Sequence, residues 1–204
     1  MKQTIFKGSG VAIITPMLED GSVNYPVLKE LLEQQIAGGT DAIVICGTTG
    51  EASALNDTEH LDVIEFACAT VNRRLPVIAG TGSNDTRHAV ALSREAKSRG
   101  ADALLQVTPY YNKPSQEGLY QHFRTVSEHS PLPVILYNIP GRSGVNMTAE
   151  TTLRLARDMK NVIGIKEASG DIEQMQRILD NRPEGFLVLS GDDGMTLDLM
   201  RRGG

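Results

Sequence analysis

The sequence predicts an α/β protein of the (β/α)8 TIM-barrel class, with the first seven strand–helix units present in this chain. Seven short apolar runs recur along 204 residues, and they begin roughly 30 residues apart, the length of a strand, a helix and their loops. Amphipathic helices separate the runs, and seven consecutive units favour a closed barrel over an open doubly wound sheet. The predicted strands are Val11–Ile14, Ala42–Ile45, Val77–Ala79, Ala103–Val107, Val134–Tyr137, Val162–Ile165 and Leu187–Leu189.

The helices between these strands carry recognisable start and stop residues. Polar N-caps precede several apolar stripes, and glycine follows them, as expected where a helix ends in a left-handed residue. The positions are Asn24 before and Gly38-Gly39 after the first helix, Asn56 with Glu59 and Asp171 with Gln174 at capping-box spacing, and Gly100 after a helix from about Asp85 to Arg99. No linker or low-complexity tract divides the chain, so residues 1–204 are predicted to form one domain.

Composition excludes several classes of protein. The formal net charge is −5 and the pI near 5.4, which argues against a nucleic-acid binder. No apolar stretch is long enough to span a membrane, and the N-terminus lacks the apolar region of a signal peptide. Cys46 in an apolar strand and Cys68 in an apolar helix do not form a C-x-x-C pair, which predicts reduced core cysteines and a cytoplasmic location.

Polar and special residues gather at the carboxyl ends of the predicted strands. In parallel α/β folds the functional site lies at these ends, so we expect the side chains to meet there. They occur in the segments Thr15-Pro16, Gly47-Thr48-Thr49-Gly50-Glu51, Gly80–Asn84, Thr108–Asn112, Tyr137-Asn138, Lys166-Glu167 and Ser190–Asp193.

Lys166 is the strongest chemical candidate in this set. Burial at the end of an apolar strand disfavours the ammonium form and lowers the pKa, which leaves some neutral amine able to attack a carbonyl carbon and form a Schiff base. A lone strand-end lysine more often extends to solvent. The neighbouring hydroxyl groups, the guanidinium of Arg142 and the flexible backbone of Gly47 and Gly50 instead favour a site for a small carbonyl compound that carries a carboxylate.

Each companion residue also has a purely structural interpretation. Thr48 and Thr49 suit a tight turn, Tyr137 suits a core aromatic with a wet hydroxyl, and Arg142 suits a solvated turn. Other chemistries fit less well: Asp85 stands where the third glycine of a dinucleotide fingerprint belongs. The four histidines fall on predicted helices rather than at strand ends, which argues against a metal-dependent aldolase site. Asp192-Asp193 is interpreted as a helix N-terminus.

Four motifs stand out at the ends of the predicted strands: Gly47-Thr48-Thr49-Gly50-Glu51, Thr108–Pro114, Tyr137–Arg142 and Gly164-Ile165-Lys166-Glu167-Ala168. Together they resemble the dihydrodipicolinate synthase (4-hydroxy-tetrahydrodipicolinate synthase) family. The resemblance runs in register from about Phe6 to the last residue. It implies a (β/α)8 barrel lyase that condenses pyruvate with L-aspartate 4-semialdehyde in the diaminopimelate route to lysine, without a cofactor, usually as a cytoplasmic homotetramer built from two tight dimers.

The resemblance also implies roles for the catalytic residues. Lys166 resembles the lysine that forms the imine with pyruvate. Tyr137 resembles the tyrosine that moves protons during imine and carbon–carbon bond formation. Thr48 and Tyr111 resemble the other members of this proton relay, and the tyrosine that matches Tyr111 reaches into the neighbouring subunit's site.

Three further residues resemble substrate-binding positions. Thr49 matches a ligand of the pyruvate carboxylate through its hydroxyl and main-chain N–H. Arg142 matches the arginine that binds the carboxylate of the semialdehyde, a task that suits a planar guanidinium. Gly191 lies where the family leaves room beside bound pyruvate.

Alternatives remain within and outside this chemistry. An N-acetylneuraminate lyase or a keto-deoxy-sugar aldolase would share the lysine and the tyrosine, although the second threonine of Gly-Thr-Thr-Gly and Arg142 favour the synthase. A catalytically silent barrel that acts as a binding module is the alternative from another class. Asn84 and Tyr110 match the lysine-effector site of inhibited members, but Asp57 and His88 do not, so we expect weak or absent inhibition by lysine.

Length is the main departure from the family. Relatives continue past residue 204 into an eighth strand and C-terminal helices. If residues 1–204 stand alone, the first and seventh strands keep unpaired edges. The apolar burial that is lost would be comparable with the whole stability margin of a domain. We therefore expect residues 1–204 by themselves to be poorly soluble, or molten, and to have little synthase activity.

Overall fold

The computed structural model describes Lys2 and residues 4–204. Seven strands follow one another in chain order in the sheet, and every described pairing between neighbouring strands is parallel. Their bounds are β1 (Gly10–Ala12), β2 (Ala42–Ile45), β3 (Val77–Gly80), β4 (Ala103–Val107), β5 (Val134–Asn138), β6 (Val162–Glu167) and β7 (Leu187–Ser190). The alternating strand–helix pattern predicted from the sequence is confirmed.

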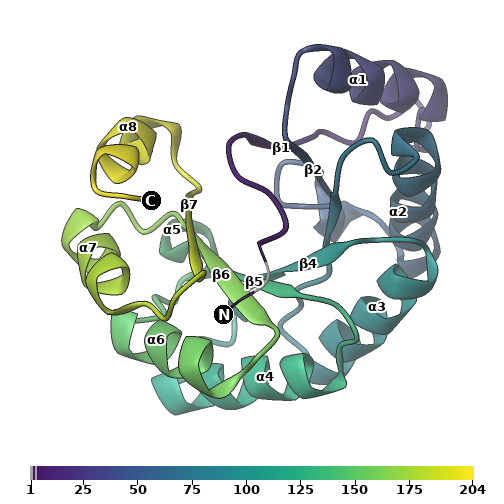
Figure 1. The fold of residues 1–204 in the computed structure, drawn as a ribbon. Helices are drawn as coiled ribbons and strands as arrows, with labels where there is room; N and C mark the ends of the chain where they lie inside the picture. Colours follow the sequence, from purple (N-terminus) through teal and green to yellow (C-terminus); the bar gives the residue numbers. More distant parts are fainter. Residues whose placement is uncertain (1, 3) are drawn as a thin grey trace. The chain divides into compact units, whose positions relative to one another are not determined.

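Helical segments connect each strand to the next (Figure 1). The α-helices are α1 (Tyr25–Ala37), α2 (Asp57–Val71), α3 (Thr86–Ser98), α4 (Gln116–His129), α5 (Pro140–Ser143), α6 (Ala149–Asp158), α7 (Ile172–Asn181) and α8 (Asp193–Arg201), and η1 (Ala52–Ala54) is a 3-10 turn. All four histidines lie on helices, as predicted. No helix among the described residues is long and apolar enough to cross a membrane.

The first strand is displaced from its predicted position. The apolar run predicts Val11–Ile14, whereas β1 ends at Ala12. Ile13 still donates its N–H to the carbonyl of Val44 at 3.1 Å, but the side chain of Ile14 is 50% exposed. Pro16 follows shortly and lacks an N–H that could continue the ladder. The other strands begin where the sequence places them, and β3, β5, β6 and β7 extend beyond their predicted ends.

Contacts divide the chain into two compact units. The N-terminal unit comprises Ile5–Thr81 and Ala91–Leu105, and so contains β1 to β3, α1 and α2. The C-terminal unit comprises Gly82–Val90 and Gln106–Gly204, together with Lys2 and Thr4. It contains β5 to β7 and α4 to α8. The expectation of one domain over residues 1–204 stays a prediction.

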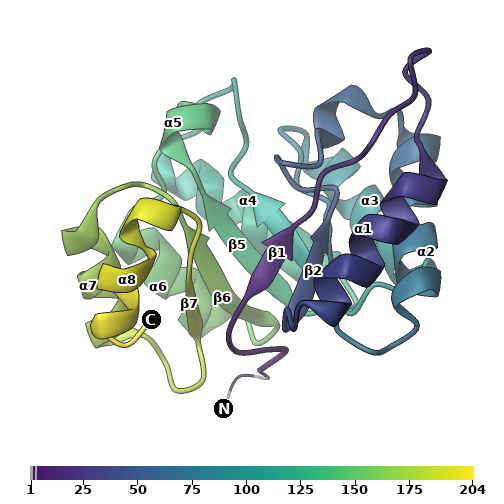
Figure 2. The same cartoon turned by 90° about the horizontal axis from the view of Figure 1, so that it is seen from above.

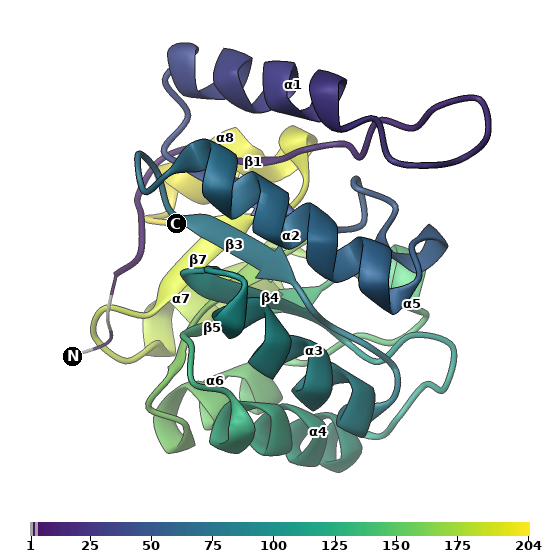
Figure 3. The same cartoon turned by 90° about the vertical axis from the view of Figure 1, so that its right-hand side faces the viewer.

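The N-terminal unit is an apolar sheet covered by α1 and α2. All four residues of β2 and of β3 are buried. Figure 2 shows α1 beside α2, and Figure 3 shows α2 lying across β3. Leu28 and Leu32 of α1 are fully buried, and Tyr25 packs on Phe66 with ring centres 4.9 Å apart. Such burial supplies the main favourable term for this unit.

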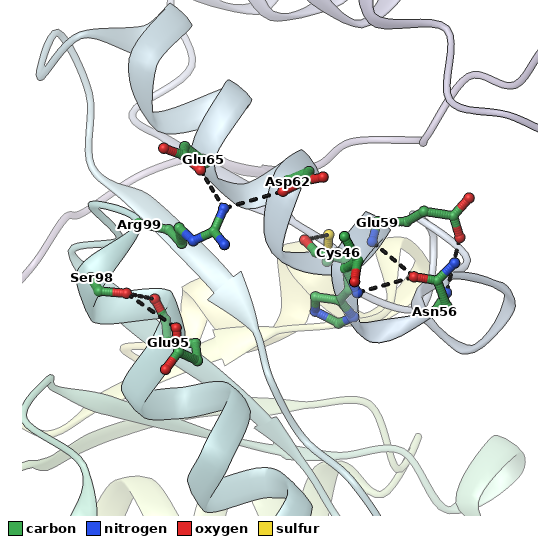
Figure 4. Close-up of polar contacts among 10 residues, drawn as sticks. Cys46, Asn56, Glu59, Asp62, Glu65, Glu95, Ser98 and Arg99 are labelled. Atoms are coloured by element: carbon green, nitrogen blue, oxygen red, sulfur yellow. Dashed lines mark hydrogen bonds and ion pairs between the residues drawn. The ribbon is translucent and has the colours of Figure 1, made fainter.

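Polar contacts in the N-terminal unit lie mostly at helix ends and on the surface (Figure 4). The predicted capping box is present: the Asn56 side chain accepts from the backbone N–H of Glu59 at 3.1 Å, and the Glu59 carboxylate accepts from the Asn56 N–H at 3.0 Å. Arg99, the residue after α3, pairs with Asp62 and Glu65 of α2. These contacts position α2 without burying charge.

The C-terminal unit places β5, β6 and β7 under a layer of helices. α4, α6 and α7 follow one another along these strands (Figure 1). Tyr137 is the register partner of Lys166, and Asn138 is the partner of Glu167. The register shifts between Val134 and Ile135, an irregularity that no feature of the sequence indicates.

Candidate active site

Lys166 and Tyr137 lie side by side at the carboxyl ends of β6 and β5. Register partners on neighbouring parallel strands project from the same face of a sheet, and Lys166 Nζ lies 4.5 Å from the centre of the Tyr137 ring. Lys166 is the fifth residue of the six-residue β6, not the residue after the strand, because the ladder continues through Glu167. The tyrosine is 4% exposed, so the amine stands against a buried ring.

The surroundings of Lys166 favour its neutral form. Burial lowers the pKa of the amine, and the negative charge of Asp193 opposes this effect. Nζ has no hydrogen-bond or ion-pair partner among the described residues. A half-buried amine without a counter-ion gains nucleophilic character near neutral pH. The desolvation predicted from the strand sequence is therefore present in the structure.

Gly191 leaves the space that the Lys166 side chain occupies. A Cβ atom at this position would lie 2.9 Å from Lys166 Cε and 3.0 Å from Ala168 Cβ, closer than side-chain carbons approach. The Gly191 N–H donates to the carbonyl of Glu167 at 2.8 Å, which fixes the turn after β7 beside the end of β6. Any larger residue would displace the lysine, so glycine has a geometric role here. Its contact with pyruvate stays a prediction.

Tyr111 and Arg142 lie on two loops that contact each other. The side chain of Tyr111 is 89% exposed, and its backbone has a φ of 71°, in the left-handed region. Its N–H donates to the carbonyl of Ser143 at 3.3 Å. Arg142, the neighbour of that acceptor, is exposed on α5. A non-glycine residue in the left-handed conformation of Tyr111 costs about 1–3 kcal/mol.

Thr48 and Thr49 lie in the N-terminal unit, in the turn after β2. Gly50 N–H donates to the Gly47 carbonyl at 3.1 Å, and Glu51 N–H donates to the Thr48 carbonyl at the same distance. Both threonines are exposed, and neither their hydroxyls nor their amides donate to another group among the described residues. Two adjacent free N–H groups suit an anionic ligand. Their position relative to Lys166 stays a prediction.

A buried polar cluster lies on the opposite face of β5 and β6, and sequence reasoning missed it. We call it the Glu167 cluster; its members are Glu167, Asn138, Gln174 and Asn146. The sequence interpretation made Gln174 the partner of Asp171 in a capping box. Asp171 does accept from the Gln174 backbone N–H at 3.0 Å, but the Gln174 side chain donates to Glu167 at 3.1 Å instead. A buried carboxylate attracts the amide more strongly than a solvated helix end does.

Other predicted features also have definite places. Asp192 accepts from the N–H of Gly194 at 2.9 Å and caps α8, which confirms the interpretation of Asp192-Asp193 as a helix N-terminus. Cys46 follows β2, where it is buried, rather than lying inside the strand. His88 contacts Ser83, with Nδ1 and Oγ 3.1 Å apart. No group of three or more metal-ligating side chains occurs among the residues that the structure describes.

Fold and site together define a class: parallel strand–helix repeats that carry a desolvated lysine and a tyrosine at the carboxyl ends of neighbouring strands. The chain belongs to the dihydrodipicolinate synthetase family, whose model matches residues 5–204.

Individual relatives agree with this assignment. The chain is 52% identical over 200 residues to 4-hydroxy-tetrahydrodipicolinate synthase of Neisseria meningitidis serogroup B, covering 98% of this chain and 68% of that protein. A crystal structure of the chloride-inhibited dihydrodipicolinate synthase of Acinetobacter baumannii with pyruvate gives a TM-score of 0.95 at 50% identity, over 98% of this chain and 68% of that one. The lysine-bound enzyme of Cyanidioschyzon merolae gives a TM-score of 0.96 at 41% identity, over 99% and 69%. The predicted fold class is confirmed.

Proposed function

We propose that this protein forms a Schiff base with pyruvate on Lys166 and condenses it with L-aspartate 4-semialdehyde to give 4-hydroxy-tetrahydrodipicolinate. The carrying observation is the half-buried amine of Lys166, 4.5 Å from the centre of the Tyr137 ring, with Gly191 leaving room for its side chain. Membership of the dihydrodipicolinate synthetase family supports the reaction, and it supports a role in diaminopimelate and lysine biosynthesis in the cytoplasm.

The first chemical step joins the amine to pyruvate. The neutral Nζ attacks the ketone carbon and forms a carbinolamine. Two proton transfers then expel the former ketone oxygen as water and leave an iminium. Tyr137, with Thr48 and Tyr111, carries these protons in the proposed mechanism. The two free amides of Thr48 and Thr49 and the Thr49 hydroxyl hold the pyruvate carboxylate, in keeping with their lack of partners.

The second half of the reaction makes the carbon–carbon bond. The iminium loses a methyl proton and becomes an enamine, whose carbon attacks the aldehyde of the semialdehyde while Arg142 holds that substrate's carboxylate. The semialdehyde's own amine then attacks the imine carbon and displaces Lys166, which closes the ring. The balance is one pyruvate and one semialdehyde converted to one product and one water. The iminium itself is the electron sink, so the proposed chemistry requires no cofactor.

Tyr111 supports an oligomeric enzyme. The Tyr111 side chain is 89% exposed on a backbone with a φ of 71°, so its aromatic ring and hydroxyl are available to pack on another surface. In the proposed function, the partner subunit of a tight homodimer supplies that surface and receives Tyr111 at its site, and two such dimers associate. The mass in solution, by light scattering, and the activity of a Tyr111→Phe variant test this arrangement.

Trapping with borohydride tests the central proposal. Incubation with pyruvate and borohydride should add one reduced pyruvate unit to a peptide that contains Lys166. Lys166→Ala should abolish the adduct, whereas Lys160→Ala, which removes an exposed lysine of the same unit, should leave it unchanged. A Lys166→Ala protein that traps pyruvate at the same stoichiometry contradicts the assignment.

Substrate comparison separates the remaining candidates. Turnover of aspartate semialdehyde with pyruvate, without cleavage of N-acetylneuraminate or a keto-deoxy sugar, is the expected result. The second threonine of the Gly-Thr-Thr-Gly turn and Arg142 favour that outcome. A protein that traps no pyruvate would instead be a silent barrel that acts as a binding module.

A further inference from the structure

The residues next to the reactive pair form a polar cluster on the other face of the sheet. Side chains alternate along a strand, so Asn138 and Glu167 point away from the face that carries Tyr137 and Lys166. Three members of the Glu167 cluster are almost inaccessible to water: Glu167 and Asn138 are 0% exposed, and Gln174 is 2% exposed. A polar group buried this deeply costs several kcal/mol unless it is fully hydrogen-bonded.

Amide N–H groups donate four hydrogen bonds to the Glu167 carboxylate, and the Ser169 side chain also contacts it. Asn138 Nδ2 lies 3.0 and 3.2 Å from its two oxygens, Gln174 Nε2 donates at 3.1 Å, and the Ser169 N–H donates at 2.9 Å. Burial raises the pKa of Glu167, and these hydrogen bonds oppose that shift. The four amide hydrogen bonds match the acceptor oxygens of a carboxylate, so the cluster is arranged around this side chain.

The same cluster holds the ends of three strands and one loop. Ala168 N–H donates to the Asn138 carbonyl at 2.9 Å, and Gly191 N–H donates to the Glu167 carbonyl at 2.8 Å. Asn138 also accepts from the Met147 N–H at 3.0 Å, and Gln174 donates to the Met147 carbonyl at 3.2 Å. The loop from β5 to α6, which carries Arg142, is thereby attached to the strands that carry Tyr137 and Lys166.

We propose that Glu167, Asn138 and Gln174 are positioning residues that hold the backbone of Lys166 and Tyr137 in the geometry for imine formation. The inference rests on the proposed function. The side chains do not touch substrate; they act through the peptide units that they share with the reactive residues. A displacement of about 1 Å at a reacting group is enough to slow a reaction by about a hundredfold, so a cluster that fixes these strand ends controls rate rather than binding.

Glu167→Gln is the sharpest test. Glutamine has the shape of glutamate, but its amide NH2 group would face the N–H donors of Asn138 and Gln174. At saturating pyruvate we expect the rate of borohydride-trapped adduct formation to fall by about tenfold or more. The pyruvate concentration for half-maximal rate should change by less than about threefold, since the proposed ligands of the pyruvate carboxylate, Thr48 and Thr49, are not members of the cluster. The pH at half-maximal rate should not move, because the effect is geometric. Glu173→Gln, an exposed glutamate of α7, is the matched control.

Two further variants keep the test decisive if Glu167→Gln folds poorly. Gln174→Met removes one donor and leaves the Glu167 carboxylate with its hydrogen bonds from Asn138 and Ser169. It should slow pyruvate trapping by about threefold or more. The control is Gln176→Met, which removes a side chain that hydrogen-bonds to Asp180 at the surface, and it should not slow trapping. Combining Asn138→Asp with Glu167→Gln swaps acceptor and donor and should recover part of the lost rate.

The outcomes separate this inference from the proposed function. A wild-type protein that traps no pyruvate refutes the proposed function and, with it, this inference. A wild-type protein that traps pyruvate, with Glu167→Gln and Gln174→Met equally fast at equal folded fraction by circular dichroism, overturns the positioning role alone. A loss that appears only as weaker pyruvate binding, or as a shifted pH midpoint, also overturns it.

Discussion

Both compact units carry ion pairs at the surface, but among the described residues only the C-terminal unit buries a carboxylate completely. In the N-terminal unit the charged side chains pair at the surface: Arg74 donates to both oxygens of Glu33 at 2.7 Å, and both side chains are more than 40% exposed. In the C-terminal unit a carboxylate is 0% exposed and is held by amide N–H groups without a cation. Surface pairs of the first kind contribute little, whereas a buried cluster of the second kind is costly when any partner is missing.

This difference follows the chemistry that each unit carries. The N-terminal unit offers backbone amides in a glycine-rich turn, whose geometry depends on main-chain hydrogen bonds. The C-terminal unit carries the amine of Lys166, which in the proposed function must stay desolvated and aligned with Tyr137. A buried cluster with one satisfactory arrangement specifies a single backbone position more strictly than exposed ion pairs do.

The largest expected effect comes from removing a partner inside the Glu167 cluster. Asn138→Leu leaves a buried carboxylate without two of its hydrogen bonds, and we expect a loss of about 3–5 kcal/mol in the free energy of unfolding. Arg74→Met in the N-terminal unit breaks a bidentate pair at the surface and should change stability too little to resolve. Urea denaturation of both variants measures the contrast. Equal losses at the two sites would show that burial does not distinguish the units.

The next largest effect concerns a buried histidine of the C-terminal unit. His122 is 5% exposed; Nδ1 contacts Thr86 Oγ1 at 2.8 Å and Nε2 has no partner among the described residues. Burial lowers the pKa of His122 from 6.5 to about 4. The unfolded chain therefore binds more protons between these values, so the stability due to this group is present above pH 6.5 and is lost as pH falls toward 4, by on the order of 3 kcal/mol.

Substituting this histidine should flatten the pH dependence. His122→Gln keeps a polar side chain but does not titrate, so the change in unfolding free energy between pH 7 and pH 4 should be smaller than in the parent protein by on the order of 3 kcal/mol. His129→Gln, an exposed position of the same helix, is the control and should leave the dependence as it is. Parallel curves for parent and His122→Gln proteins would contradict the assignment.

Local signals predicted most of the fold. The strand positions, the Asn24 and Asn56 caps and the Asp192 cap depend on residues within a few positions of one another, and the structure confirms each of them. Lys166 was recognisable because an apolar run ends beside it. The early end of β1 was missed because the run continues through Ile13 and Ile14, although only the first of these is buried.

The Glu167 cluster could not be predicted from local signals, because its members are far apart in the sequence. Its members, at positions 138, 146, 167 and 174, meet only because the register sets Asn138 opposite Glu167, and the shift at Val134/Ile135 is part of that register. The one available signal was an acidic residue that completes an apolar strand. Gln174 had a local alternative at Asp171, so spacing alone favoured the wrong partner for its side chain.

Lys166 itself should lower the stability of the C-terminal unit. Because burial lowers its folded-state pKa below the ordinary 10.5, the unfolded chain binds more protons and stability rises with pH through that window. Lys166→Met should therefore stabilise the fold at pH 7, by about 1 kcal/mol, while abolishing the pyruvate adduct. Lys160→Met at the surface should do neither. The gain in unfolding free energy should be smaller at pH 10 than at pH 7. A Lys166→Met protein that is less stable than the parent would show that burial of the amine carries no desolvation penalty.

The smallest expected effect distinguishes charge from burial at the amine. Asp193 raises the pKa of Lys166, against the larger opposing effect of burial. Asp193 is exposed in the first turn of α8, so water and salt screen its influence. Asp193→Asn should move the midpoint of the pH–rate curve for borohydride trapping to lower pH, and the difference from the parent protein should diminish in concentrated salt. Asp198→Asn, farther along α8, should leave the midpoint in place. An upward shift in Asp193→Asn would mean that the carboxylate acts by holding α8 against β7 rather than through its charge.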